Sequence, residues 1–163
     1  MKAFVFAAGL GTRLKPLTDT CPKALLEVAG RPMLVHAVNK LYHSGVRRII
    51  INVHHHAEQM KAFIANLSAG SEKTRPGLEL HISDESDLLL DTGGGLKKAS
   101  EMLRGEGPFF AWNADVISDI DLTAMMEYHR KFKPIATLAV TNRQGSRYFL
   151  WENNRLAGWE NIQ

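Results

Sequence analysis

The chain has 163 residues, 45% of them hydrophobic and 23% charged, which excludes a disordered, collagen-like or disulfide-rich protein and predicts one domain, residues 1–163. The 20 basic and 17 acidic residues give a net charge of +3, and no Lys/Arg block points to a nucleic-acid partner or a membrane surface. The single cysteine excludes an internal disulfide and favours a reducing compartment, the cytoplasm. No apolar run reaches the roughly 18 residues of a membrane span.

Apolar runs and helical periodicity alternate along the chain. Strands buried on both faces are expected where the apolar run is continuous, and helices where apolar residues recur every three or four positions. From the N-terminus, the expected elements are a strand at 3–7, a helix at 32–44, a strand at 48–53, a helix at 57–67, a flexible stretch at 68–76 and a strand at 78–82. They continue with a helix at 93–103, a strand at 109–112, a helix at 122–132, a strand at 135–140, and a hairpin of 149–151 with 155–159 around Asn153-Asn154.

This alternation predicts an α/β fold, with a largely parallel sheet and helices on both of its faces. Right-handed crossovers place the loops that follow the strands along one edge, where ligands bind outside the carboxyl ends of the strands. Those loops begin near Ala8, Val53, Ser83 and Asn113, so we expect the functional residues there.

The loop after the first strand contains Gly9-Leu10-Gly11-Thr12-Arg13 and, further along, Pro22-Lys23. Glycine lets the backbone approach an anion and direct N–H groups toward it, and the planar guanidinium of Arg13 suits phosphate oxygens. Leu14 stands where a dinucleotide-binding fingerprint needs its third glycine, and the Walker phosphate-loop sequence does not occur. A plain glycine-rich turn with solvated cations is the alternative interpretation.

The Gly9-Leu10-Gly11-Thr12-Arg13 motif and Pro22-Lys23 together resemble the signature of the sugar-phosphate nucleotidyltransferases, the NDP-sugar pyrophosphorylases. The resemblance continues through Leu90-Asp91-Thr92-Gly93-Gly94-Gly95 and Asn113-Ala114-Asp115, and is strongest to bacterial mannose-1-phosphate guanylyltransferases and N-acetylmuramate 1-phosphate uridylyltransferases. It implies a three-layer Rossmann-like fold and transfer of a nucleotidyl group from an NTP to a sugar 1-phosphate, with release of pyrophosphate. Because catalytic domains of this family are usually longer, it also implies that the chain is C-terminally truncated and could bind nucleotide without completing the reaction.

The resemblance implies roles for individual residues. Arg13 would hold the β- and γ-phosphates, Lys23 the α-phosphate or the incoming sugar phosphate, and Asp115 a Mg²⁺ ion, which prefers carboxylate and phosphate oxygens. The nucleotide-binding residues would be Ala8, Gly9, Gly11, Thr12, Arg13, Ser83, Asp84, Thr92, Gly93 and Gly94, with Ser83 and Asp84 at the edge of the base. The sugar-phosphate contacts would come from Lys23, Asn113, Arg147 and Tyr148.

Several of these residues have a plainer interpretation. Asp115 could cap a helix, although two later aspartates are better placed to do so, and Ala114 precedes it where many relatives have glycine. The glycine run at 93–95 could be a hinge and a helix start. His54-His55-His56 suggests a metal site, but neighbours on an extended chain point in opposite directions, so we expect a structural role for them.

The leading hypothesis is therefore a sugar-1-phosphate nucleotidyltransferase that uses mannose 1-phosphate with GTP or N-acetylmuramate 1-phosphate with UTP. The alternative is a non-catalytic regulatory module of the same fold that binds a nucleotide or sugar nucleotide, and a dehydrogenase is a weaker third. The intact Arg13, Lys23 and Asp115 favour the enzyme. The sequence leaves open the nucleobase, the sugar, and whether the chain forms a homo-oligomer.

Overall fold

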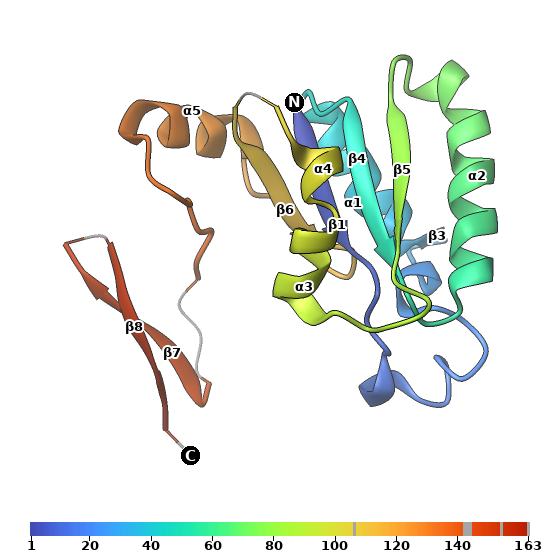
Figure 1. Cartoon of the computed structure of the whole chain (residues 1–163), viewed down its shortest axis with the longest axis horizontal. Coiled ribbons are helices and arrows are strands. Elements are labelled where there is room, and N and C mark those ends of the chain that lie inside the picture. The colour runs from blue at the N-terminus through green and yellow to red at the C-terminus, as the bar shows by residue number, and fades with distance from the viewer. Residues whose placement is uncertain (106, 142–144, 154, 163) are drawn as a thin grey trace. The chain divides into compact units, whose positions relative to one another are not determined.

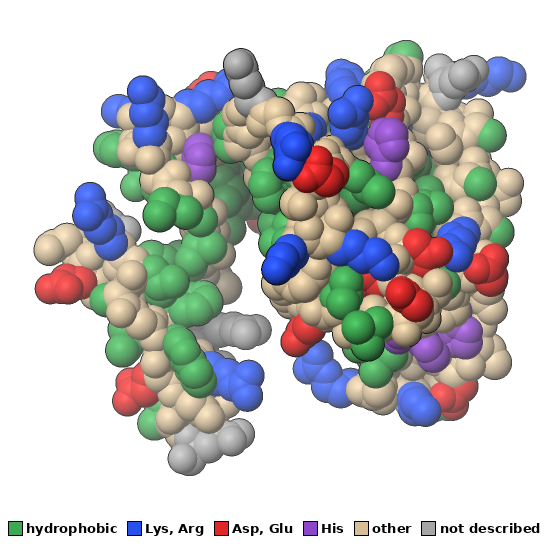
Figure 2. Space-filling view, viewed as in Figure 1, with side chains coloured by type: hydrophobic (Ala, Val, Ile, Leu, Met, Phe, Trp, Pro, Cys, Tyr) green, Lys and Arg blue, Asp and Glu red, His purple; other side chains and the backbone are tan. Residues whose placement is uncertain are grey.

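The computed structural model describes residues 1–105, 107–141, 145–153 and 155–162. These residues form two compact units, Met1–Thr123 and Ala124–Gln163. Over the first unit, basic and acidic side chains are mixed on the face that Figure 2 shows. None of the helices in the described ranges is long and apolar enough to cross a lipid bilayer.

The first unit is built on a four-stranded parallel sheet with the strand order β5-β4-β1-β6 (Figure 1). Its strands are β1 (Lys2–Phe6), β4 (Arg48–Val53), β5 (Glu79–Asp84) and β6 (Phe109–Asn113). In the register of the inner strands, Phe4 of β1 pairs with Ile50 of β4 and with Ala111 of β6. Residues 3–5 and 49–51 are fully buried, as expected for strands that are covered on both faces.

Helices cover both faces of this sheet, which confirms the predicted α/β architecture. They are α1 (Met33–His43), α2 (Ala57–Thr74), α3 (Asp91–Lys98) and α4 (Ser100–Leu103). On one face, Phe4 and Ile50 pack against Ala99 and Leu103, so the pair α3–α4 closes the core there. In Figure 1, α1 lies behind the sheet, and it buries Leu34, Val38 and Leu41 of the apolar spacing that predicts it.

The helix α2 is longer than its apolar periodicity predicts. It continues to Thr74, so most of the stretch at 68–76, which we expected to be flexible, is helical. The small residues of this stretch are typical of a loop, but tertiary packing stabilises the helix. Ser71 is buried, and Arg75 Nε, at the end of the helix, donates to Asn39 Oδ1 of α1 at 2.7 Å. Within the helix, the Ser71 hydroxyl donates to the Leu67 carbonyl at 2.6 Å.

The helix expected at 93–103 also differs in its bounds. It begins at Asp91, two residues earlier than expected, and is divided at Ala99 into α3 and α4, so the glycine run lies inside α3 rather than at its first residues. Four short elements could not be predicted from hydrophobic periodicity, because two or three residues are too few to show a period. They are the 3₁₀ turns η1 (Thr12–Leu14) and η2 (Lys23–Leu25) and the small antiparallel pair β2 (Glu27–Val28) and β3 (Arg31–Pro32).

The second unit contains most of α5 (Leu122–Phe132) and an antiparallel hairpin of β7 (Arg147–Glu152) and β8 (Arg155–Asn161). The predicted helix and hairpin are confirmed, with longer strands, and Asn154 of the predicted turn lies outside the described residues. The strand expected at 135–140 is wrong. Among the described strands none pairs with this segment, and Ile135 is fully exposed. An apolar run predicts burial, but a strand forms only where a neighbouring backbone completes its hydrogen bonds.

Candidate functional site

A cavity of about 420 Å³ opens at the carboxyl edge of the parallel sheet in the first unit. Its walls come from the ends of the strands, the first loop, η2 and the segment between β5 and α3. The predicted site residues that line it are Ala8, Gly9, Arg13, Lys23, Thr92, Asn113 and Asp115. The cavity therefore lies where the topology of a parallel sheet predicts a ligand site.

Lys23 and Asp115 form an ion pair in the wall of this cavity. Lys23 is the first residue of η2 and Asp115 comes two residues after β6, so the sheet brings them together across 92 positions of sequence. Their side chains are 25% and 36% exposed, and Arg13 lines the same cavity. Two cations and a carboxylate that line one cavity can bind an anionic ligand together with a divalent cation.

The first loop folds back on itself at Gly11. This residue has a left-handed backbone (φ 67°), and a Cβ atom there would stand 2.8 Å from Cγ2 of Thr18. Thr18 is fully buried, and its hydroxyl donates to the Gly11 carbonyl at 2.9 Å. Both the backbone angle and the close packing therefore require glycine at this position. Gly11 and Thr12 shape the loop, but neither lines the cavity.

Asn52 lines the cavity and is a residue that the sequence analysis missed. It is buried in β4, where its Oδ1 accepts from the N–H groups of Ala7 and Ala8 at 2.7 and 3.2 Å. Its Nδ2 donates to Glu85 Oε1 at 2.9 Å. The sequence does contain a signal for it: Asn52 is a polar residue inside an apolar strand, and a buried polar side chain must find hydrogen-bond partners. Asn52 thus ties the start of the first loop to the segment after β5.

Glu85 is the second missed residue of the cavity wall. Its side chain is fully buried, and while Oε1 is bound by Asn52, Oε2 has no partner among the described residues. Gly95 of α3 packs against this pair, since a Cβ atom at Gly95 would lie 2.8 Å from Glu85 Oε1 and 3.0 Å from Asn52 Nδ2. The third glycine of the run is therefore the one that the packing of the site requires.

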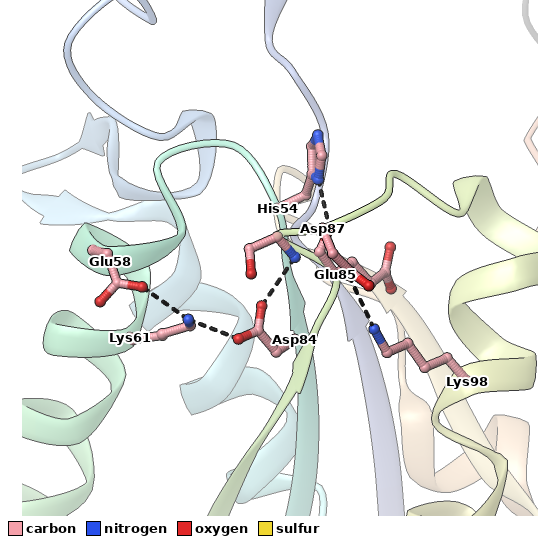
Figure 3. Close-up of polar contacts among 8 residues, drawn as sticks. His54, Glu58, Lys61, Asp84, Glu85, Asp87 and Lys98 are labelled. Atoms are coloured by element: carbon pink, nitrogen blue, oxygen red, sulfur yellow. Dashed lines mark hydrogen bonds and ion pairs between the residues drawn. The ribbon is translucent and has the colours of Figure 1, made fainter.

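Ser83 and Asp84, which we expected at the edge of a base, do not line the cavity. The strand β5 continues through both of them, and its alternation buries Ser83, whose hydroxyl has no partner among the described residues. Asp84 turns toward α2, where it pairs with Lys61 Nζ at 2.7 Å, and it also accepts from the Ser86 N–H at 2.9 Å (Figure 3). The side chain that this segment does present to the cavity is Glu85.

The contacts of Asp84 make a pH-dependent contribution to stability. Hydrogen bonds from Lys61 and Ser86 hold the pKa of the Asp84 carboxyl well below its usual range. Because this pKa is depressed in the folded state, the stabilisation is present above about pH 4 and is lost as the pH falls toward the folded pKa. We therefore expect the difference in unfolding free energy between wild type and Asp84→Asn to be constant near neutral pH and to shrink in acid.

Urea unfolding of both proteins from about pH 7 down to about pH 3 measures this difference. It should stay below about 1 kcal/mol, since the Lys61 and Asp84 side chains are 29% and 44% exposed. The asparagine keeps an acceptor for the Ser86 N–H, so the comparison isolates the charge. The pH dependence should become smaller in a Lys61→Met background, where only the Ser86 hydrogen bonds still lower the Asp84 pKa. A difference that does not change with pH would contradict the assignment.

The remaining predicted residues lie elsewhere in the two units. Gly93 and Gly94 are inside α3 and do not line the cavity, whereas Thr92 does. Arg147 and Tyr148 belong to β7 in the second unit, where the Tyr148 hydroxyl accepts from the Gly145 N–H at 3.0 Å. Their contact with a sugar phosphate stays a prediction.

The family of the chain follows from its similarity to known proteins. Residues 2–149 match the model of the family described as nucleotidyl transferase. The chain therefore belongs to the nucleotidyltransferase family, in agreement with the motif at residues 9–13 and the cavity beside it.

Two curated relatives and one solved structure show which members of the family this chain is similar to. A mannose-1-phosphate guanyltransferase of Hypocrea jecorina is 37% identical over 150 residues, which are 91% of this chain and 40% of the relative. An N-acetylmuramate alpha-1-phosphate uridylyltransferase of Caulobacter vibrioides is 44% identical over 115 residues, 71% of this chain and 46% of the relative. The chain thus spans less than half the length of these two relatives. A solved UDP-glucose pyrophosphorylase from Acinetobacter baumanii shares the fold, with a TM-score of 0.66 at 20% identity over 82% of this chain and 54% of that one.

Proposed function

We propose that the protein transfers a nucleoside monophosphate group from a nucleoside triphosphate to a sugar 1-phosphate, giving an NDP-sugar and pyrophosphate. The observation that carries this proposal is the Lys23–Asp115 ion pair in a cavity that Arg13 also lines. Membership of the nucleotidyltransferase family and the names of the two relatives support it.

The chemistry needs alignment and charge rather than a base. A sugar 1-phosphate has a second pKa of about 6, so it is mostly a dianion at neutral pH. One of its oxygens attacks the α-phosphorus in line, a new P–O bond forms, and the bond to the bridging oxygen of pyrophosphate breaks. The chain must neutralise the phosphates and hold the reacting groups in line. Arg13 would bind the leaving β- and γ-phosphates, and Lys23 the α-phosphate or the sugar phosphate.

Asp115 fits a Mg²⁺ site of the kind that nucleotides complete. This ion prefers one or two carboxylates, with phosphate oxygens and water as its other ligands. In the described part of the chain, no group of three or more His, Cys, Asp or Glu side chains could hold a metal, so a site completed by phosphates suits these residues better than a protein cage. When bound, the ion would neutralise phosphate oxygens. Lys23 contacts the same carboxylate, so it would keep Asp115 oriented toward the cavity.

The substrate pair is proposed from the relatives. One relative is named for mannose 1-phosphate and a guanylyl group, and the other for N-acetylmuramate 1-phosphate and a uridylyl group. We infer that this chain uses one of these two substrate pairs. We also infer that it acts in the cytoplasm, because a single cysteine, which forms no internal disulfide, fits a reducing compartment.

Two measurements test the proposal. Calorimetric titration with UTP, GTP, dTTP and CTP, each with and without Mg²⁺, should show selective binding of one triphosphate that the metal strengthens. A pyrophosphate-release assay with GTP and mannose 1-phosphate, and with UTP and N-acetylmuramate 1-phosphate, should then show turnover with one pair. Binding without turnover on either pair would contradict the enzyme and favour a nucleotide-sensing module. Absence of binding to any of the four triphosphates would contradict both.

A further inference from the structure

Three consecutive histidines after β4 contact both loops that border the cavity. Nδ1 of His54 lies 2.6 Å from the Glu85 carbonyl oxygen, in the segment between β5 and α3 (Figure 3). Nε2 of His55 and Nε2 of His56 lie 3.4 and 3.3 Å from one acceptor, the Thr18 carbonyl oxygen of the first loop. A carbonyl oxygen only accepts, so each ring nitrogen donates, and the two lone pairs of the Thr18 carbonyl accommodate both donors.

The backbone of His56 explains how two neighbouring rings reach one acceptor. On an extended chain, consecutive side chains point to opposite sides. His56 has a left-handed φ of 51° directly before α2, and this turn brings the rings of His55 and His56 to a centroid distance of 4.0 Å. His54 contacts the other loop. The triplet therefore divides its contacts between two carbonyls instead of converging on one metal ion.

On the side of the first loop, the contacted residue fixes the turn that carries Arg13. Thr18 donates its hydroxyl to the Gly11 carbonyl, and the same carbonyl accepts the hydrogen bond that closes η1. Gln59, in the first turn of α2, donates to the Thr20 carbonyl at 3.1 Å. The start of α2 thus holds the distal part of the loop from two neighbouring points.

On the side of the second loop, Glu85 is held by three consecutive residues. Its N–H donates to the Val53 carbonyl at 2.8 Å, its carboxylate accepts from Asn52, and its carbonyl accepts from His54. Residues further along this segment line the cavity. The end of β4 therefore determines where this loop leaves the sheet.

We infer that His54, His55 and His56 are positioning residues of the nucleotide site. His55 and His56 hold the loop that carries Arg13, and His54 holds the loop that carries Glu85, so one short segment sets the spacing between two walls of the cavity. The identity of the ligand rests on the proposed function, whereas the positioning of the loops does not.

Two pairs of variants separate these contacts from general packing. The first-loop variant is His55→Leu with His56→Leu, and the second-loop variant is His54→Leu. Their matched controls keep a donor near the lost nitrogen. A glutamine amide reaches about as far as Nε2, and an asparagine amide about as far as Nδ1, so the controls are His55→Gln with His56→Gln, and His54→Asn.

Amide hydrogen exchange without any ligand measures the positioning directly. In the first-loop variant, the amides of Leu14, Leu17 and Asp19, which are bonded within that loop, should exchange about tenfold faster, because two hydrogen bonds to the loop are lost. The amides of Glu85 and Leu88 should keep their wild-type rates. In the second-loop variant the pattern should reverse, with about fivefold faster exchange at Glu85 and Leu88. Both matched controls should return most of the protection.

The inference fails if either leucine variant accelerates exchange equally in both loops, since that would be loss of global stability. It also fails if neither loop changes, or if the glutamine and asparagine controls exchange as fast as the leucine variants.

Measuring nucleotide affinities of the same variants tests whether the positioning of the loops affects binding. The first-loop variant should lower the ratio of triphosphate to monophosphate affinity about tenfold, because it displaces Arg13, and His54→Leu should leave this ratio within about twofold. Equal ratios in the two variants would overturn the division of roles. If the wild type binds no nucleotide, the proposed function fails, while the exchange pattern still decides whether the histidines position the loops.

Discussion

Replacing Lys23 with alanine is expected to lower the rate of pyrophosphate release at least about a hundredfold while the chain stays folded, as loss of a cation aimed at developing charge typically does. Among the described residues, Lys23 and Arg13 supply the positive charges that line the cavity. The Lys23 side chain is only 25% exposed, so its charge acts on a ligand with little screening by water. The substitution also leaves the Asp115 carboxylate without its partner. Steady-state kinetics with saturating triphosphate and varied sugar phosphate measure the effect.

The control for this variant is Lys73→Ala, which removes the same side chain from an exposed position near the end of α2. It should leave the rate within about twofold of the wild type, and both variants should keep the wild-type unfolding midpoint to within a few degrees. A near-normal rate for Lys23→Ala would exclude Lys23 from the reaction. A collapsed midpoint would instead assign it a structural role.

Replacing Asn52 with leucine is expected to lower the unfolding free energy by about 3–5 kcal/mol. Leucine has a similar volume but accepts and donates nothing, so the N–H groups of Ala7 and Ala8 lose their acceptor. Glu85 then has no described partner for either carboxylate oxygen inside a buried wall. Urea unfolding at neutral pH, followed by circular dichroism, measures the change.

The same substitution at an exposed position provides the reference. Asn66→Leu on α2 should change the unfolding free energy by less than about 0.5 kcal/mol. A loss below about 1 kcal/mol for Asn52→Leu would mean that the hydrogen bonds of Asn52 contribute little to stability. Asn52→Leu should also abolish nucleotide binding, since it releases both the start of the first loop and the segment after β5.

The sheet and the location of the site could be predicted from the sequence because their signals are local. A continuous apolar run such as 49–51 marks a strand covered on both faces, and parallel strands then bring Lys23 and Asp115 to one edge. The short motif at 9–13 needed no tertiary information to be recognised.

Features that depend on a distant partner could not be predicted in this way. The strand expected at 135–140 is apolar, but whether such a segment pairs is decided by another backbone. In the sequence, Glu85 is one of three carboxylates in the polar segment Asp84-Glu85-Ser86-Asp87, which predicts an exposed side chain. Its burial depends on contacts with Asn52 and Gly95, which are distant in the sequence. Ser83 and Asp84 lie within β5 and do not line the cavity, because the strand ends two residues later than its apolar alternation predicts.

The close approach of Gly95 to Asn52 and Glu85 makes these three positions one mutational unit. The helix α3 stands as near to β4 and β5 as a residue without a side chain permits, so even a methyl group at position 95 meets both hydrogen-bonded partners. A larger residue at position 95 therefore requires a shorter side chain at position 52 or 85. Conversely, replacing Glu85 with a shorter residue, for example to reshape the cavity, makes room for a side chain at position 95. Substitutions at positions 52, 85 and 95 should therefore be correlated, although the three positions are far apart in the sequence.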